Sequence, residues 1–193
     1  MGGFFSYVGE RIFGPNARLV EMVPPPSAGR PAPDWRDVES RLGVVLPADY
    51  KRLVEVYGPG RFGDFLEVYT PGAASQWVDI FHQAGRGEWR VQQFVQHGEQ
   101  LPVEPSSLLP VAGTDNGDTV YWVRKPLDQP DRWTIVVNQA RNFLDWPAFD
   151  GGLVEFLVAV FSKEHKNRAF PDDFPDPVEP TVFTPSTYSS PDE

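Results

Sequence analysis

Three histidines, His82, His97 and His165, are the residues of this sequence best suited to acid–base catalysis or zinc binding. They do not have the HxxxH or HExxH spacing that brings two imidazole rings to one face of a helix. The 193-residue chain contains no Cys, so thiolate ligands, disulfides and cysteine nucleophiles are excluded. We therefore predict no metal site.

Two short glycine-containing motifs are similar to ligand-binding loops. Residues 58–63 read GPGRFG and match GxGxxG, but a dinucleotide site needs this motif after a strand and before a helix. Here the motif follows a predicted helix and precedes a predicted strand. Residues 115–118 read DNGD, which lacks the ligand spacing of an EF-hand and is typical of a hairpin turn. No GxSxG motif is present, so the sequence contains no local signature of a hydrolase, and we predict no cofactor.

Tryptophans and acids remain as candidates for contact with another protein. Aromatic side chains surrounded by charge are typical of binding hot spots. The chain has six Trp, and since Trp is also a common core residue, only some can be contacts. The predicted partner-binding residues are Asp64, Glu67, Trp77, Asp79, Glu88 and Trp89.

The charge of the chain limits the class of partner. The formal net charge is −10, and the six acids that follow Phe170, with no Lys or Arg among them, leave −4 for residues 1–170. Nucleic-acid binders carry a basic face, so we predict no nucleic-acid partner and expect a protein with a basic surface. No apolar run is long enough to span a membrane and the N-terminus lacks a basic leader, so we expect a cytoplasmic protein.

The apolar spacing predicts where helices and strands form. Helices are predicted near residues 34–42 and 47–57, and a last helix near 151–162 is predicted to begin after Asp150. Residues 75–97 have a helical pattern that Gly85 and Gly87 are predicted to divide into two pieces. Strands are predicted at 65–69, 119–123 and 133–137. Strands that cluster without regular helical crossovers indicate one α+β domain, with an antiparallel twisted sheet packed by N-terminal helices and a C-terminal helix.

The two ends of the chain are predicted to lie outside this domain. Residues 1–33 are interpreted as an N-terminal arm followed by a Pro-rich linker, and residues 34–165 as the domain itself. Residues 166–193 are interpreted as an acidic tail rich in Pro, which is either disordered or a loosely attached strap held by Phe174, Phe183 and Tyr188. We expect that deletion of residues 171–193 leaves the domain folded.

Several local patterns occur in order along the chain: WxxVExxLG from Trp35, LPxDY from Leu46 and YGxG from Tyr57, followed more loosely by LLPV from Leu108 and a Trp at 133. Together they resemble the SUKH superfamily, which includes a yeast cell-wall-synthesis regulator and many bacterial immunity proteins. The similarity covers roughly residues 34–162. We interpret the shared residues as fold determinants and not as contacts: Trp35, Leu42, Pro47, Tyr50, Tyr57, Gly58 and Trp122.

This resemblance implies a function without catalysis. Members of the superfamily block secreted toxins by direct protein–protein binding, so the resemblance implies an immunity protein whose partner is a cognate toxin. The alternative is a regulatory or scaffold protein of the same superfamily with no toxin partner, which flexible flanking segments would suit.

Overall fold

The computed structural model describes residues 15–27, 31–140 and 145–186, and it centres on one open antiparallel sheet. The seven strands lie in the order β6-β5-β4-β3-β2-β1-β7. Their bounds are β1 Gly60–Phe62, β2 Leu66–Val68, β3 Leu108–Thr114, β4 Thr119–Val123, β5 Thr134–Asn138, β6 Ala148–Phe149 and β7 Phe183–Pro185. The predicted α+β class and antiparallel sheet are confirmed.

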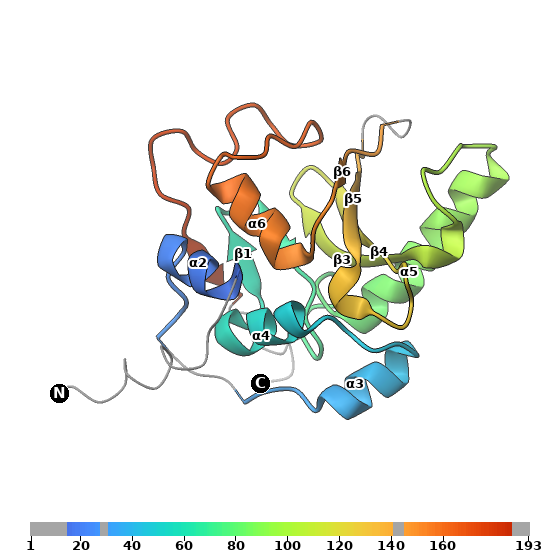
Figure 1. Ribbon diagram of the computed structural model, residues 1–193, viewed down its shortest axis with the longest axis horizontal. Helices are drawn as coiled ribbons and strands as arrows, with labels where there is room; N and C mark the ends of the chain where they lie inside the picture. The colour runs from blue at the N-terminus through green and yellow to red at the C-terminus, as the bar shows by residue number, and fades with distance from the viewer. Residues whose placement is uncertain (1–14, 28–30, 141–144, 187–193) are drawn as a thin grey trace.

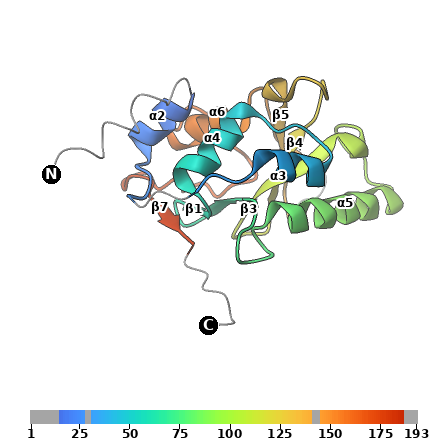
Figure 2. The same cartoon turned by 90° about the horizontal axis from the view of Figure 1, so that it is seen from below.

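Helices cover both faces of the sheet. They are α2 Pro15–Met22, α3 Trp35–Leu42, α4 Ala48–Tyr57, α5 Ile80–Gln96 and α6 Leu153–Phe161, with 3-10 turns η1 Pro105–Ser107 and η2 Pro130–Arg132. Helices α2, α4 and α6 gather on one side of the sheet (Figure 1), and the view from below shows α5 on the other (Figure 2). The protein therefore has three layers.

Alternation along the central strand β4 explains why both faces are buried. Val120 and Trp122 enter the larger core cluster, with α4 and α6, whereas Tyr121 and Val123 enter a smaller cluster with α5. Successive side chains of a strand point to opposite faces, so a strand with large apolar side chains at four successive positions, as in residues 120–123, needs cover on both sides. Helix α5 supplies the second cover.

The segment around the LPxDY pattern joins three elements of the larger cluster. Asp49 accepts a hydrogen bond from the Tyr50 amide (2.6 Å) and another from the Val154 amide (3.2 Å), so its carboxylate binds the first turn of α6. The Tyr50 hydroxyl donates to the Tyr69 carbonyl (2.7 Å), and its ring meets Trp122 edge-on at 5.0 Å between centroids. These contacts support the interpretation of Tyr50 and Trp122 as fold determinants.

Three details of the predicted helices need correction. Residues 80–96 form one helix and not two pieces, because Gly85 and Gly87 both adopt helical backbone within α5. The last helix, α6, begins after Gly152 and not after Asp150. The Gly152 amide donates a hydrogen bond to the Glu155 carboxylate, so Glu155 and not Asp150 caps the start of this helix. On α3, the fully buried residue is Val38, while Trp35 and Leu42 are only partly buried beside it.

The predicted boundary at residue 34 is too late. Helix α2, which the sequence assigned to an arm, contacts α6 and α4, and Leu19 and Val23 are fully buried. The Tyr57 hydroxyl donates a 2.6 Å hydrogen bond to the Val23 carbonyl, so the chain after α2 is fixed to α4. Residues 1–14 of the predicted arm lie outside the described residues.

The predicted tail is also ordered over much of its length. Phe174 packs edge-on against Phe170, which is buried, and β7 pairs with β1 at the edge of the sheet. Phe183 on β7 lies 5.0 Å from Tyr57 and 4.8 Å from Phe62 between ring centroids. Phe174 and Phe183 therefore attach the described part of the tail to the domain as a strap and not as a disordered segment, because these aromatic side chains supply apolar area that offsets the entropy of ordering. Tyr188 lies outside the described residues.

Phe183→Ala should therefore lower the free energy of unfolding by about 2–4 kcal/mol, since it removes a partly buried ring from a packed aromatic cluster. Urea unfolding measures the loss. Val182→Ala is the matched control, because Val182 is exposed and should cost less than about 0.5 kcal/mol. Equal small losses for both variants would show that the tail does not contribute to the core.

Candidate functional site

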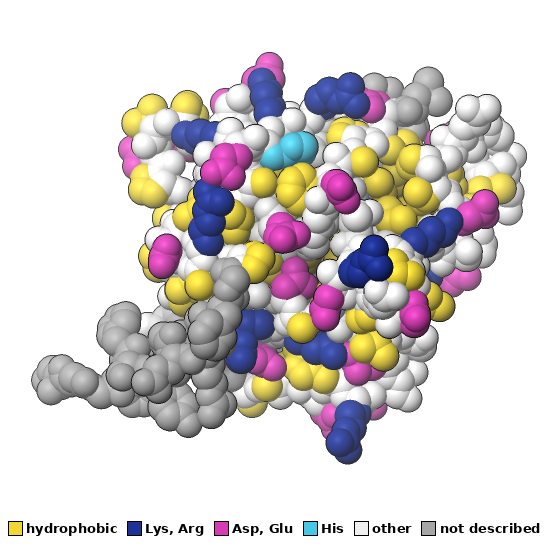
Figure 3. Space-filling model, viewed as in Figure 1, with side chains coloured by type: hydrophobic (Ala, Val, Ile, Leu, Met, Phe, Trp, Pro, Cys, Tyr) yellow, Lys and Arg dark blue, Asp and Glu magenta, His cyan; other side chains and the backbone are white. Residues whose placement is uncertain are grey.

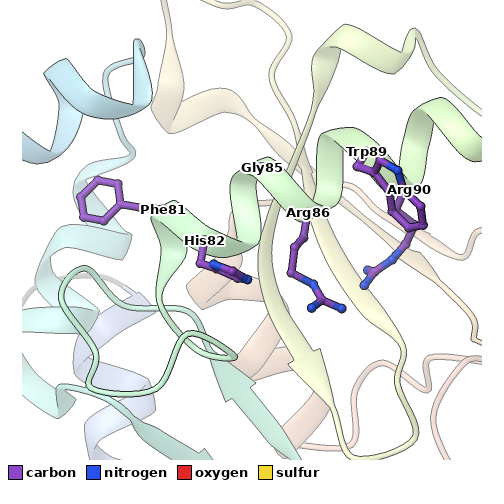
Figure 4. A pocket seen from close by; sticks show the side chains of 6 residues that line it. All are labelled: Phe81, His82, Gly85, Arg86, Trp89 and Arg90. Atoms are coloured by element: carbon purple, nitrogen blue, oxygen red, sulfur yellow. The ribbon is translucent and has the colours of Figure 1, made fainter. Parts of the chain in front are cut away.

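The outer face of α5 carries a concave surface. The helix is anchored by one buried face, made of Ile80, Gln83, Gly87, Val91 and Phe94. Its other face borders a shallow groove of about 560 Å³, shown in Figure 4. The groove is lined by Phe81, His82, Gly85, Arg86, Trp89 and Arg90.

Two exposed tryptophans stand beside this groove. Trp89, on α5, is 64% exposed, and Trp77, in the segment before α5, is 56% exposed. The Arg86 guanidinium lies 4.5 Å from the centroid of the Trp77 ring, so the two side chains form a cation–π pair. An amphipathic ring left in water gains from burial against a partner, and Trp and Arg are the residues most enriched in binding hot spots.

The charge within the groove is positive. Arg86 and Arg90 project to the same side of α5 (Figure 4), and Arg90 donates a 2.5 Å hydrogen bond to the Thr119 hydroxyl. At the start of the helix the Arg41 guanidinium lies over the Phe81 ring, 3.4 Å from its centroid. The groove is thus basic, although the chain as a whole has a net charge of −10.

Two acids predicted as contacts lie near α5: Asp79 directly before the helix and Glu88 within it. Asp79 precedes the helix and accepts a 3.2 Å hydrogen bond from the Gly72 amide. Glu88 is exposed and interacts with Arg124. Burial lowers the pKa of Arg124, and the negative charge of Glu88 opposes this effect. On the face seen in Figure 3, acidic and basic side chains are interspersed and form no single acidic patch.

Asp64 and Glu67 belong to a different part of the molecule, the β1–β2 hairpin. Asp64 adopts a left-handed backbone (φ 51°) and its carboxylate accepts a 2.9 Å hydrogen bond from the Thr184 hydroxyl. Glu67 is only 9% exposed, accepts a hydrogen bond from the Ser186 hydroxyl (3.1 Å) and pairs with Arg61 (3.5 Å). Both carboxylates are therefore engaged by the chain's own last strand or hairpin.

The structure thus gathers four of the six predicted contact residues around α5 and separates two. The sequence reasoning missed Phe81, Arg86 and Arg90. Their signal was present in the helical spacing, because Phe81, Gly85 and Trp89 are four residues apart, as are Arg86 and Arg90, and residues so spaced lie on one face. This pattern was not recognised because the sequence analysis predicted a break in the helix at Gly85 and Gly87.

The two glycines of α5 differ in their structural need. A Cβ on Gly87 would lie 2.5 Å from Cγ of Pro110, so close packing of α5 on β3 requires glycine there. A Cβ on Gly85 would meet no atom within 4 Å, and Gly85 does not have a positive φ. Glycine inside a helix costs about 1 kcal/mol relative to alanine, so Gly85 lowers stability without a packing or backbone reason.

The described residues contain neither a metal-ligand cluster nor a membrane-spanning helix. No group of three His, Asp or Glu side chains among them is placed to hold a metal ion. Within the same residues, no helix has the length and apolar character needed to cross a membrane. The chemistry of the α5 groove is that of recognition by aromatic and cationic side chains.

Glu67 gives the hairpin a measurable pH dependence. Burial raises the pKa of Glu67 above its ordinary value, and the opposing effects of Ser186 and Arg61 are smaller. The folded protein therefore holds this proton more tightly than the unfolded chain, and ionisation of Glu67 weakens folding as the pH rises through the raised pKa.

The free energy of unfolding of the wild type, measured relative to that of Glu67→Gln, should accordingly fall as the pH rises above the ordinary Glu pKa and through the raised pKa of Glu67. In the wild type the hydrogen bond from Ser186 lowers the pKa of Glu67. Ser186→Ala removes this bond and should raise that pKa further, so the fall in the free energy of unfolding should become larger. Urea unfolding across this pH range checks both. A wild-type-to-variant difference that is constant with pH would contradict the burial of a charged Glu67.

Comparison with known proteins identifies the scaffold that carries this groove. A family model described as SMI1-KNR4 cell-wall (SUKH_6) matches residues 33–149, more than half of the chain. Neither the curated proteins nor the solved structures gave a match. The match begins just before α3 and ends at β6, so it includes α5 and its groove, and it confirms the resemblance seen in the sequence: the chain belongs to the SMI1-KNR4 cell-wall family, SUKH_6.

Proposed function

We propose that this protein is an immunity protein that neutralises a toxin by binding it in the cytoplasm, and that the α5 groove is its contact surface. Proteins of this family are often toxin immunity proteins. The observation that carries the proposal is the pair of exposed tryptophans beside a groove that also contains two arginines. Large exposed aromatic side chains grouped on one face are typical of protein interaction surfaces.

The mechanism is occlusion without turnover. Trp77, Trp89 and Phe81 supply apolar area that is removed from water when a partner covers the groove. Arginines supply directional hydrogen bonds around this area. The toxin is inactive while its working surface is covered, and the duration of protection follows the dissociation rate of the complex.

The regulatory alternative depended on flexible flanking segments. Residues 15–23 and much of 170–185 instead pack on the body of the protein, through Leu19, Val23 and Phe183. These segments are therefore committed to the fold in the described structure, and they do not supply the flexible flanks that the alternative needs.

The proposal predicts that Trp89→Ala and Trp77→Ala each weaken binding of the toxin encoded beside this chain's gene. A hot-spot Trp contributes about 2 kcal/mol or more, which is roughly a thirtyfold increase in Kd. Calorimetric titration measures Kd, and survival of cells that express the toxin measures protection.

Val178→Ala serves as the control. Val178 is 84% exposed and belongs to the segment after α6. This segment lies away from α5 in Figure 1. Full protection by the Trp77/Trp89 double variant, with an unchanged Kd, would exclude this face of α5 as the toxin-binding surface.

A further inference from the structure

Gly85 leaves the backbone of α5 open at the centre of the groove. Phe81 and Trp89 stand one turn before and one turn after it on the same helix, so the floor of the groove is bare main chain between two rings. Glycine inside an exposed helix permits another chain to approach the helix backbone closely. Because neither packing nor φ requires Gly85, this opening is a feature that a bound segment can use.

The side chains that face this opening select the charge of that segment. Arg86 and Arg90 lie along one flank, Arg41 stacks on Phe81 at one end, and His82 lines the groove. In the described part of the chain, neither Arg86 nor Arg90 has a carboxylate within ion-pair distance. Guanidinium groups bind carboxylates through two parallel hydrogen bonds, and such pairs are among the stronger polar contacts between proteins.

The acids near the helix do not neutralise this flank. The Asp79 carboxylate accepts a hydrogen bond from the Gly72 amide before the helix begins. Glu88 lies on the other flank of α5, towards Arg124. The groove therefore has unmatched positive charge beside its aromatic rings.

We infer that the groove binds an acidic segment of the partner protein, whose backbone crosses α5 at Gly85 between Phe81 and Trp89 and whose carboxylates pair with Arg86 and Arg90. This inference rests on the proposed function, since it gives the chemistry of the toxin segment that occupies the surface. It differs from the expectation drawn from net charge, which pointed to a basic partner surface.

The net charge of the chain and the two arginines of the groove act over different distances. The net charge of −10 attracts a basic protein over roughly a Debye length, about 8–10 Å at physiological salt. Arg86 and Arg90 act only at contact. A toxin surface that is basic around an acidic segment satisfies both, and enzymes that cleave nucleic acids combine basic surfaces with metal-binding carboxylates in this way.

The occupant can be tested without the toxin by a nuclear magnetic resonance titration of the full chain. The probes are a short peptide of alternating Glu and Leu, the same peptide with Lys in place of Glu, and a short oligothymidylate. We expect the acidic peptide to shift the Gly85 amide and the Trp89 indole signals, and the basic peptide to leave both unchanged. Stronger shifts with the oligothymidylate would overturn the inference in favour of a nucleic-acid site.

Two substitutions test the geometry. Gly85→Ala should raise the midpoint of thermal unfolding by about 2–4 °C, as expected for a better helix former in a protein of this size, and weaken acidic-peptide binding about tenfold or more. A variant with Arg86 and Arg90 both changed to Glu should abolish the shifts. Arg132→Glu is the matched charge control, because Arg132 is an exposed arginine on η2 that bonds only Gln129 among the described residues.

Gly87→Ala distinguishes a general effect of helix glycines from the effect at Gly85. It should lower the thermal midpoint, because its Cβ would collide with Pro110. If Gly85→Ala stabilises the protein and leaves peptide binding unchanged, the backbone crossing at Gly85 is wrong.

The two proposals can fail separately. If the toxin binds wild-type protein and both tryptophan variants equally well while the acidic peptide still shifts Gly85, the function assigned to the groove is wrong but its ligand chemistry holds. If the tryptophan variants lose protection while the acidic peptide gives no shift at Gly85, the immunity surface stands and the acidic occupant is excluded.

Discussion

The hydroxyl of Tyr50 makes the contact on which both the core and the candidate site depend. Tyr50 is fully buried and burial, with a smaller effect from the Asp79 charge, raises its pKa well above the ordinary value, so the hydroxyl remains a donor. It donates to the carbonyl of Tyr69, and the next residue, Thr70, exchanges backbone hydrogen bonds with Val78 (2.9 Å) and Ile80 (3.3 Å). One core tyrosine thus fixes the segment that presents Trp77 and begins α5.

Sequence periodicity was sufficient for the elements that bury a continuous apolar face. Helix α4 and strands β4 and β5 were predicted closely, because their spacing follows the 3.6 and 2.0 periods of buried helices and strands. Strands β1, β6 and β7 have two or three residues each and were not predicted, whereas β2 is as short but lies within the recognisable run FLEVY at 65–69. The sequence left disorder and a strap as alternatives for residues 170–185, because the strap depends on contacts of Phe174 and Phe183 with distant rings, which local composition does not contain.

The candidate site was predicted in part for a related reason. Trp77 and Trp89 are recognisable by residue type alone, and both lie beside the groove. The sign of the local charge was not recognisable, because net charge sums over the whole chain and more than half of it comes from the acids after Phe170. Arg86 and Arg90 become a pair only when residues 80–96 form one unbroken helix.

The fold determinants and the candidate site lie in different layers of the protein, which explains how a shared scaffold can carry a specific site. Residues that we interpreted as fold determinants, such as Tyr50 and Trp122, lie in the layer of α3, α4 and β4, and the outer face of α5 contains none of them. Helix α5 is fixed by its inward stripe, so side chains on its outer face can change with little loss of core packing. A fold specifies a scaffold and not its function, which resides in the surface placed on it. Exposed Trp89 and the open backbone at Gly85 give this scaffold no folding advantage, and the proposed recognition of a partner would give both a role.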